Sequence, residues 1–140
     1  MRDLKVKKLN SDAILPTRAY KYDAGADLYS MDEKVVEPGE GYKFSTGIAV
    51  DIDRGYYGQL HTRSSMSLRG WAVVGGVIDS SYKGELSVVL RNMSKQPLTV
   101  SKGHRIAQLV IHSIATPVII EVNDIGTSER GSGAFGSTGR

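Results

Sequence analysis

The sequence contains no cysteine among its 140 residues. Disulfide bonds, thiolate nucleophiles and cysteine-based metal sites are therefore excluded. The charged start, "MRDLKVKKLN", also lacks the apolar stretch of a secretory signal peptide. Both absences favour a reducing compartment, so we expect an intracellular, cytoplasmic protein.

Long apolar runs and a strong charge excess are missing as well. No stretch approaches the roughly 20 apolar residues of a membrane-spanning helix, so no membrane partner is expected. The 18 basic and 15 acidic residues leave a net charge of only +3. That balance is too mild to predict direct binding to nucleic acid, but it is compatible with a small anionic ligand.

Several common catalytic motifs are absent. The sequence has no Walker-type phosphate loop, no dinucleotide-binding glycine fingerprint and no G-x-S-x-G nucleophile motif. Its three histidines, His61, His104 and His112, do not show the spacing of metal ligands. An enzyme built from the remaining residues would use carboxylates, arginines, hydroxyl groups and a hard cation, which suits hydrolysis at phosphorus.

The sequence does contain an apolar pattern with a period of two, which predicts β-strands. In "ELSVVLRNM" this pattern places Leu86, Val88 and Leu90 on one face, and "RIAQLVIHSI" and "TPVIIEV" are apolar enough for strands buried on both sides. Short strands between recurrent turn signals predict one all-β domain, a sandwich, jelly roll or barrel. Only "SSMSLRG", residues 64–70, predicts a helical turn, with serines able to cap its start.

Polar residues interrupt this pattern at four places. Asp27 follows "AGA", Gln108 lies inside an apolar run, and Arg63 precedes two serines at the predicted helix start, where an anion would be favoured. In "GGVIDSSYKGEL", Asp79 ends one predicted strand of a hairpin. Each residue also has an ordinary structural interpretation: a turn aspartate, a hydrogen-bonded buried amide, or a surface arginine beside a helix cap.

The last eleven residues, "RGSGAFGSTGR", differ in composition from the rest of the chain. A glycine-rich end of this kind is usually a disordered tail. However, it carries a single aromatic residue, Phe135, together with hydroxyl groups and unhindered backbone amides. Such a segment can wrap around an anion.

Five motifs occur in order: "AGADL", "RSSMSLRG", "GGVIDSSYKGEL", "GHRIAQL" and "RGSGAFGSTG". With these motifs the chain resembles the trimeric all-β deoxyuridine triphosphatases (dUTPases). The resemblance implies a distorted jelly-roll or β-sandwich-like barrel of the β-clip type with one short helix over residues 1–129. It also implies a flexible C-terminal arm, residues 130–140, that closes a neighbouring subunit's active site in a homotrimer. The cytoplasm or nucleus of a host cell would be the location of a viral member.

The implied reaction is Mg²⁺-assisted attack of water on the α-phosphorus of dUTP, giving dUMP and pyrophosphate. This supplies dUMP and keeps uracil out of DNA. Asp79 would be the general base and hold the 3′-hydroxyl side of the sugar, and Tyr82 would pack under the deoxyribose. Backbone groups of Gly76, Val77 and Ile78 would contact uracil, and the phosphates would be bound by Arg63, Ser64, Ser65 and Gln108. Asp27 and Gln108 would hold Mg²⁺ through water. The lid would contribute Arg130, Phe135, Gly136, Ser137 and Thr138.

Some positions depart from the family's usual residues, but none of them removes a group with an implied chemical role. They are Ala26, Ser65, Ser81, Lys83, His104 and Ala134. Two other functions are compatible with the sequence. A related deoxycytidine nucleotide deaminase would need a catalytic glutamate, and Glu85 is the only acid near the turn besides Asp79. A nucleotide-dependent switch protein could use the same site.

Overall fold

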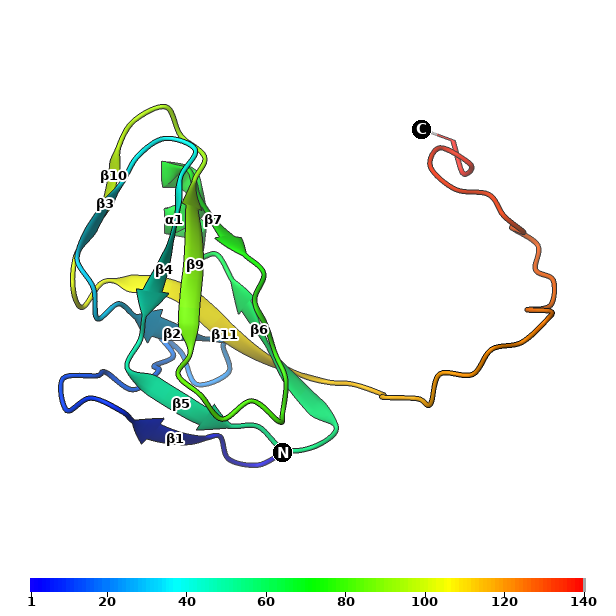
Figure 1. Ribbon diagram of the computed structural model, residues 1–140, viewed down its shortest axis with the longest axis horizontal. Helices are drawn as coiled ribbons and strands as arrows, with labels where there is room; N and C mark the ends of the chain where they lie inside the picture. Colours follow the sequence, from blue (N-terminus) through cyan, green and yellow to red (C-terminus); the bar gives the residue numbers. More distant parts are fainter. Residues whose placement is uncertain (140) are drawn as a thin grey trace.

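The computed structural model describes residues 1–139, and their regular structure is almost entirely β (Figure 1). The one helix lies where the sequence predicts it, so the expected all-β class with a short helix is confirmed. The elements are β1 (Lys5–Lys8), β2 (Gly25–Tyr29), β3 (Lys34–Val36), β4 (Gly41–Ser45), β5 (Ile48–Asp51), β6 (Tyr56–His61), α1 (Ser64–Arg69), β7 (Trp71–Val74), β8 (Val77–Ile78), β9 (Ser87–Asn92), β10 (Leu98–Val100) and β11 (Arg105–Ser113).

The strands form two larger antiparallel sheets and two small ones. The four-stranded sheet has the order β2-β11-β6-β8, and the three-stranded sheet has the order β4-β9-β7. Strands β1 and β5 form one pair, and β3 and β10 form another. Sheet neighbours such as β2 and β11 are far apart in the sequence, as the long crossovers of a jelly roll require.

The core lies between the two larger sheets. Leu86, Val88 and Leu90 are each 0% exposed, so the alternation in this stretch correctly predicts the buried face. They share one apolar cluster with Phe44 on β4 and Leu109 on β11. This shared core makes the two sheets one sandwich-like body.

The helix boundaries also follow the sequence, but its predicted cap does not. The N-cap position is Arg63, which makes no side-chain capping hydrogen bond, so the expected serine cap is wrong. The helix ends at Gly70, whose φ of 102° only glycine adopts readily. No helix within residues 1–139 has the length and apolar character needed to cross a membrane.

The predicted β-hairpin around Asp79 has the expected turn but different strand pairing. The backbone N–H of Tyr82 donates to the carbonyl of Asp79 at 3.0 Å, which closes the turn. Strand β8 pairs with β6, whereas β9 pairs with β4 and β7. The flanking strands therefore lie in different sheets, and the expectation that they pair with each other is wrong.

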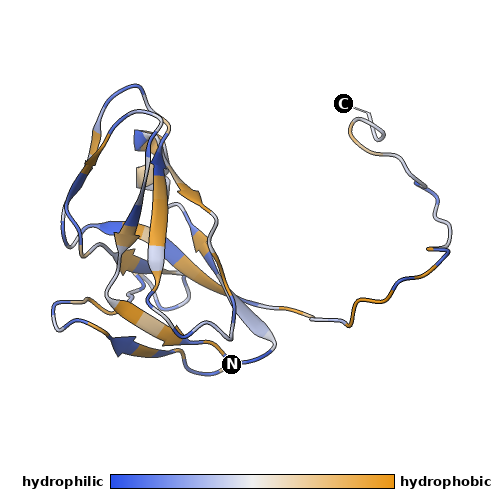
Figure 2. Ribbon diagram, viewed as in Figure 1, coloured by the Kyte–Doolittle hydropathy of each residue, from blue (hydrophilic) through white to orange (hydrophobic). Residues whose placement is uncertain are grey.

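Residues 114–139 extend away from the body as an arm without strands (Figure 1). The arm carries an apolar stretch close to the body (Figure 2), in which Val118, Ile119 and Ile120 are 87%, 96% and 72% exposed. The prediction that "TPVIIEV" forms a buried strand is therefore wrong for the single chain. No strand pairs with it among the described residues.

Candidate functional site

A cavity of about 480 Å³ gathers residues from three of the five motifs. Asp27 comes from β2, Gln108 from β11, and Arg63 from the start of α1. Because Asp27 and Gln108 are directly opposite in the β2–β11 ladder, their side chains lie on the same face of the sheet. The complete lining is Ala19, Asp23, Ala24, Gly25, Asp27, Arg63, Ser64, Ser65 and Gln108.

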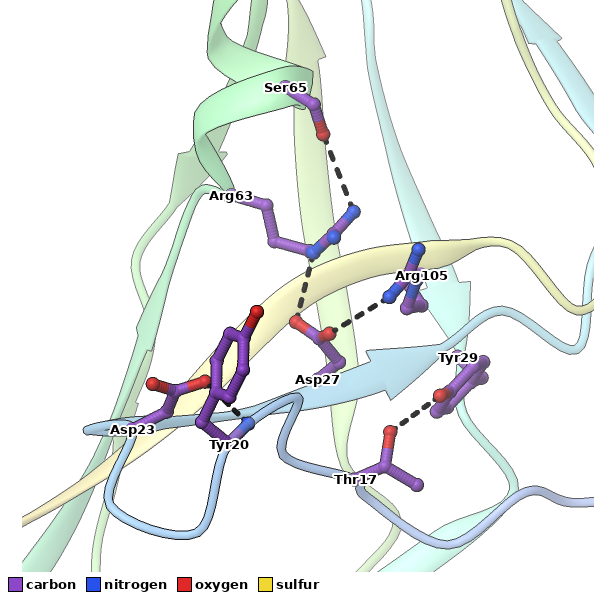
Figure 3. A network of polar contacts seen from close by, with 8 residues as sticks. All are labelled: Thr17, Tyr20, Asp23, Asp27, Tyr29, Arg63, Ser65 and Arg105. Atoms are coloured by element: carbon purple, nitrogen blue, oxygen red, sulfur yellow. Dashed lines mark hydrogen bonds and ion pairs between the residues drawn. The ribbon is translucent and has the colours of Figure 1, made fainter.

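The Asp27 carboxylate lies between two guanidinium groups (Figure 3). Arg63 donates from Nε to one carboxylate oxygen at 2.9 Å, and Nη1 of Arg105 lies 3.6 Å from the other. The side chain of Asp27 is only 14% exposed, so water screens this network less than it would a surface pair. Arg63 also donates to the hydroxyl of Ser65 at 3.4 Å. The cavity thus presents hydrogen-bond donors suited to phosphate oxygens beside a carboxylate suited to a cation.

Arg105 was not predicted as a site residue. Strict alternation along β11 would put Arg105 and Gln108 on opposite faces, because they are three residues apart. A register shift between Arg105 and Ala107 changes this, since Arg105 pairs with Tyr29 while Gln108 pairs with Asp27. The irregularity brings Arg105 to the Asp27 side. The only signal in the sequence that points to Arg105 is its place in the fourth motif, "GHRIAQL".

The third motif lines a separate cavity of about 230 Å³. Val77 and Ile78 form its strand wall, and Asp79 and Tyr82 come from the turn that follows. Strand β8 is the outer strand of its sheet, so its second edge stays available for hydrogen bonding to a ligand. The remaining lining residues, Lys43, Glu85 and Ser87, were not predicted as site residues.

Gly76 fixes the backbone just before this strand. Its φ is 107°, and an added Cβ would lie 3.0 Å from the carbonyl oxygen of Leu60. The Leu60 N–H donates to the Gly76 carbonyl at 2.8 Å. A side chain at residue 76 would therefore strain the backbone and push it away from β6.

Several contacts hold the turn after Asp79 against the body. The Lys83 ammonium group donates to the carbonyl of Ser80 at 2.8 Å and also pairs with Asp51 at the end of β5. This pairing lowers the pKa of Asp51 below its ordinary value. Glu85 accepts a hydrogen bond from the hydroxyl of Ser45 on β4. The position of Asp79 is thus set by a turn anchored to two other strands.

The fifth motif lies with neither cavity. Phe135 is fully exposed on the arm, and Nε of Arg130 donates locally to the carbonyl of Gly133 at 2.7 Å. Gly136, Ser137 and Thr138 lie on the same arm, outside both linings. One chain therefore brings together motifs one, two and four, keeps the third in a second cavity, and leaves the fifth apart.

The side chains of the larger cavity restrict how a metal ion could bind there. Within residues 1–139, no group of three or more histidine or acidic side chains is placed to hold a metal ion. Both oxygens of Asp27 already contact arginines. These residues fit a Mg²⁺ ion that arrives with a phosphate ligand and keeps its own waters, rather than an ion caged by protein alone.

Comparisons with known proteins identify the family of this chain. A family model described as dUTPase matches residues 11–139. The deoxyuridine 5'-triphosphate nucleotidohydrolase of Clostridioides difficile is 44% identical over 142 residues, which cover 99% of each chain. A variant of the Staphylococcus bacteriophage 80alpha dUTPase with dUpNHpp has a TM-score of 0.91 and 34% identity, with 100% of both chains covered.

A variant dUTPase from phage phi11 of S. aureus, whose structure describes the coordination of a structural Mg(II) ion, has a TM-score of 0.84 and 29% identity. That match covers 90% of this chain and 100% of the other. The family model spans most of the chain, and relatives match it over nearly its whole length. The chain therefore belongs to the dUTPase family of enzymes.

Proposed function

We propose that this enzyme hydrolyses dUTP to dUMP and pyrophosphate by attack of water on the α-phosphorus. The observation that carries the proposal is the pair of cavities, one with donors for phosphate and one with Asp79 beside a free strand edge. The dUpNHpp present with the bacteriophage 80alpha relative is a dUTP analogue, which supports the same ligand class here.

The nucleoside would occupy the smaller cavity. Backbone groups of Gly76, Val77 and Ile78 would read the uracil edge, using the side of β8 that does not pair with β6. Tyr82 would lie under the deoxyribose, and Asp79 would hold the 3′-hydroxyl side of the sugar. The cavity volume of about 230 Å³ suits a nucleoside better than a whole triphosphate.

The triphosphate would extend to the larger cavity. Arg63, Ser64 and Ser65 would bind its oxygens, and Asp27 and Gln108 would hold the waters of a Mg²⁺ ion bound to it. When bound, Mg²⁺ would neutralise the charge on the phosphate oxygens. Arg63 would supply fixed positive charge where negative charge develops during attack.

In the chemical step, Asp79 would accept a proton from the attacking water. The water oxygen would form a bond to the α-phosphorus, and the bond from that phosphorus to the bridging oxygen would break. Pyrophosphate would leave with the electron pair of that bond. Arg63 and Gln108 would keep the phosphate chain aligned during this displacement.

The separation of the motifs supports assembly into a homotrimer in which each site is shared between chains. The 130–140 segment of one copy would close over the cavities of another, with Phe135 over the uracil. Arg130, Gly136, Ser137 and Thr138 would then meet the phosphates. The exposed aliphatic residues at the start of the arm support burial against another copy, because a lone chain leaves them in water.

Pyrophosphate release tests the proposal. We expect rapid release from dUTP with Mg²⁺, and little release from dTTP, dCTP or UTP or after addition of EDTA. Tight dUTP binding without release would instead identify a nucleotide-dependent switch. Release of ammonia from a deoxycytidine nucleotide would identify a deaminase, although Glu85 already contacts Ser45.

A further inference from the structure

The ring of Tyr82 folds back over Gly84. A Cβ atom added to Gly84 would lie 2.7 Å from Oη, 2.8 Å from Cζ and 3.0 Å from Cε2 of Tyr82. Real Cβ atoms do not approach other atoms so closely, so the ring can lie there only because residue 84 has no side chain. Gly84 is not among the glycines with positive φ, so its backbone conformation does not itself require glycine.

The same end of the ring also makes a hydrogen bond. The Tyr82 hydroxyl donates to the carbonyl oxygen of Glu85 at 2.7 Å. That carbonyl belongs to a firmly held segment, because the Glu85 carboxylate accepts from Ser45 and the N–H of Leu86 donates to the carbonyl of Ile48 at 2.8 Å. The hydroxyl end of the tyrosine ring therefore lies over Gly84 and is tied to the body by a hydrogen bond.

We propose that Gly84 and the Glu85 carbonyl are positioning groups that hold Tyr82 rigid and thereby set the discrimination between dUTP and UTP. This inference rests on the proposed function. The two substrates differ by one hydroxyl group on the sugar. A yielding apolar contact rejects an added hydroxyl by only about a hundredfold. A ring that is held in place rejects the added hydroxyl more strongly. The contact with Gly84 and the hydrogen bond to Glu85 therefore control the specificity for dUTP over UTP.

The substitution Gly84→Ala tests the steric half of this proposal. Its methyl group would meet the far end of the Tyr82 side chain and not backbone, so we expect the ring to be displaced while the fold persists. The ratio of kcat/KM for dUTP to that for UTP should fall by about tenfold or more. General destabilisation would lower both values together and leave the ratio unchanged.

Gly41→Ala is the matched control. A Cβ at Gly41 would meet only the carbonyl oxygen of Leu90, at an ordinary 3.6 Å, and Gly41 also lacks a positive φ. It lies at the start of β4 and lines neither cavity. The substrate ratio of this variant should equal that of the wild type.

Tyr82→Phe tests the hydroxyl half while keeping Gly84. The ring loses its tie to Glu85, so the ratio should fall, but less than in Gly84→Ala. The double variant should lower the ratio by less than the product of the two separate fold-reductions, because both substitutions act through one ring. If Gly84→Ala does not fold, Tyr82→Phe alone decides the question.

Ratios within about twofold of the wild type in every folded variant would overturn the inference. A wild-type enzyme that releases no pyrophosphate from dUTP would instead reject the proposed function. The two failures are thus distinguished by the wild-type measurement.

Discussion

Asp79 directly follows β8 and is an exposed carboxylate at the smaller cavity. Its replacement by asparagine keeps the shape of the side chain but removes the proton acceptor. We expect Asp79→Asn to bind dUTP almost as tightly as the wild type while kcat falls by about 10²–10⁴-fold. Calorimetric binding and pyrophosphate release measure the two quantities separately. Turnover close to that of the wild type would rule out Asp79 as the base.

Gly25 determines where Gln108 lies. A Cβ at Gly25 would be 2.3 Å from the amide oxygen of Gln108 and 2.9 Å from its Cβ. Gly25→Ala should therefore move both the Gln108 side chain and the strand that carries it, with a loss of about 1–3 kcal/mol in the free energy of unfolding. We also expect a drop in kcat/KM for dUTP.

Chemical denaturation and steady-state kinetics check the Gly25 prediction. Gln108→Ala is the informative comparison, because it removes the amide without adding volume at residue 25. If Gly25→Ala retains full activity, the Gln108 amide has no part in substrate or metal binding.

The Lys83–Asp51 ion pair links the turn between β8 and β9 to β5, and both side chains are about half exposed. Lys83, first by its hydrogen bond and then by its charge, holds the pKa of Asp51 below its ordinary value. A lowered carboxyl pKa contributes stability above the unfolded-state pKa, and this contribution is lost as the pH falls through the folded-state pKa.

Lys83→Met should raise the pKa of Asp51 toward its ordinary value. The variant should be slightly less stable than the wild type at neutral pH, and this difference should vanish in acid once Asp51 is protonated. The effect should be small because exposed ion pairs contribute little. NMR titration of the Asp51 carboxyl carbon and denaturation at both pH values provide the measurements. An unchanged Asp51 pKa would contradict the prediction.

The elements that depend on local pattern were predictable from the sequence, whereas their pairing was not. Alternation identified the buried face of β9, and the serine-rich stretch identified α1. The pairing of β8 with β6 could not be inferred, because proximity in sequence favours a hairpin. The prediction for "TPVIIEV", residues 116–122, was wrong for a related reason: its apolar residues predict a strand, but no described strand of this chain pairs with it.

The motifs could indicate which residues line the larger cavity, but not how these residues are arranged. The motifs indicated Asp27, Arg63 and Gln108, and the structure places them around one cavity. The bridge from Arg63 through Asp27 to Arg105 joins three distant segments and depends on a strand irregularity. Periodicity in one strand does not contain that information.

The complete molecule consists of a packed body and an arm that the body does not hold (Figure 1). Deleting residues 130–140 should leave the proposed trimer folded, since residues 130–139 lie outside the core, but should greatly reduce dUTP turnover. Deleting from residue 114 onward should also weaken the trimer, because it removes exposed aliphatic residues such as Ile119 and Ile125.

Light scattering and pyrophosphate release check these two truncations. Circular dichroism of both variants controls for loss of the fold. Full activity of the shorter truncation would show that the last segment is not a lid, and its unfolding would show that the segment is structural.

The central position of β11 has a consequence for synthesis on the ribosome. Strands β2 and β6 are made early, but each pairs with β11, which ends only at Ser113. The four-stranded sheet therefore cannot close until most of the chain has been translated. At about 5–20 residues per second the arm follows within roughly a few seconds. A nascent chain thus leaves the apolar faces of β2 and β6 uncovered until β11 has been made.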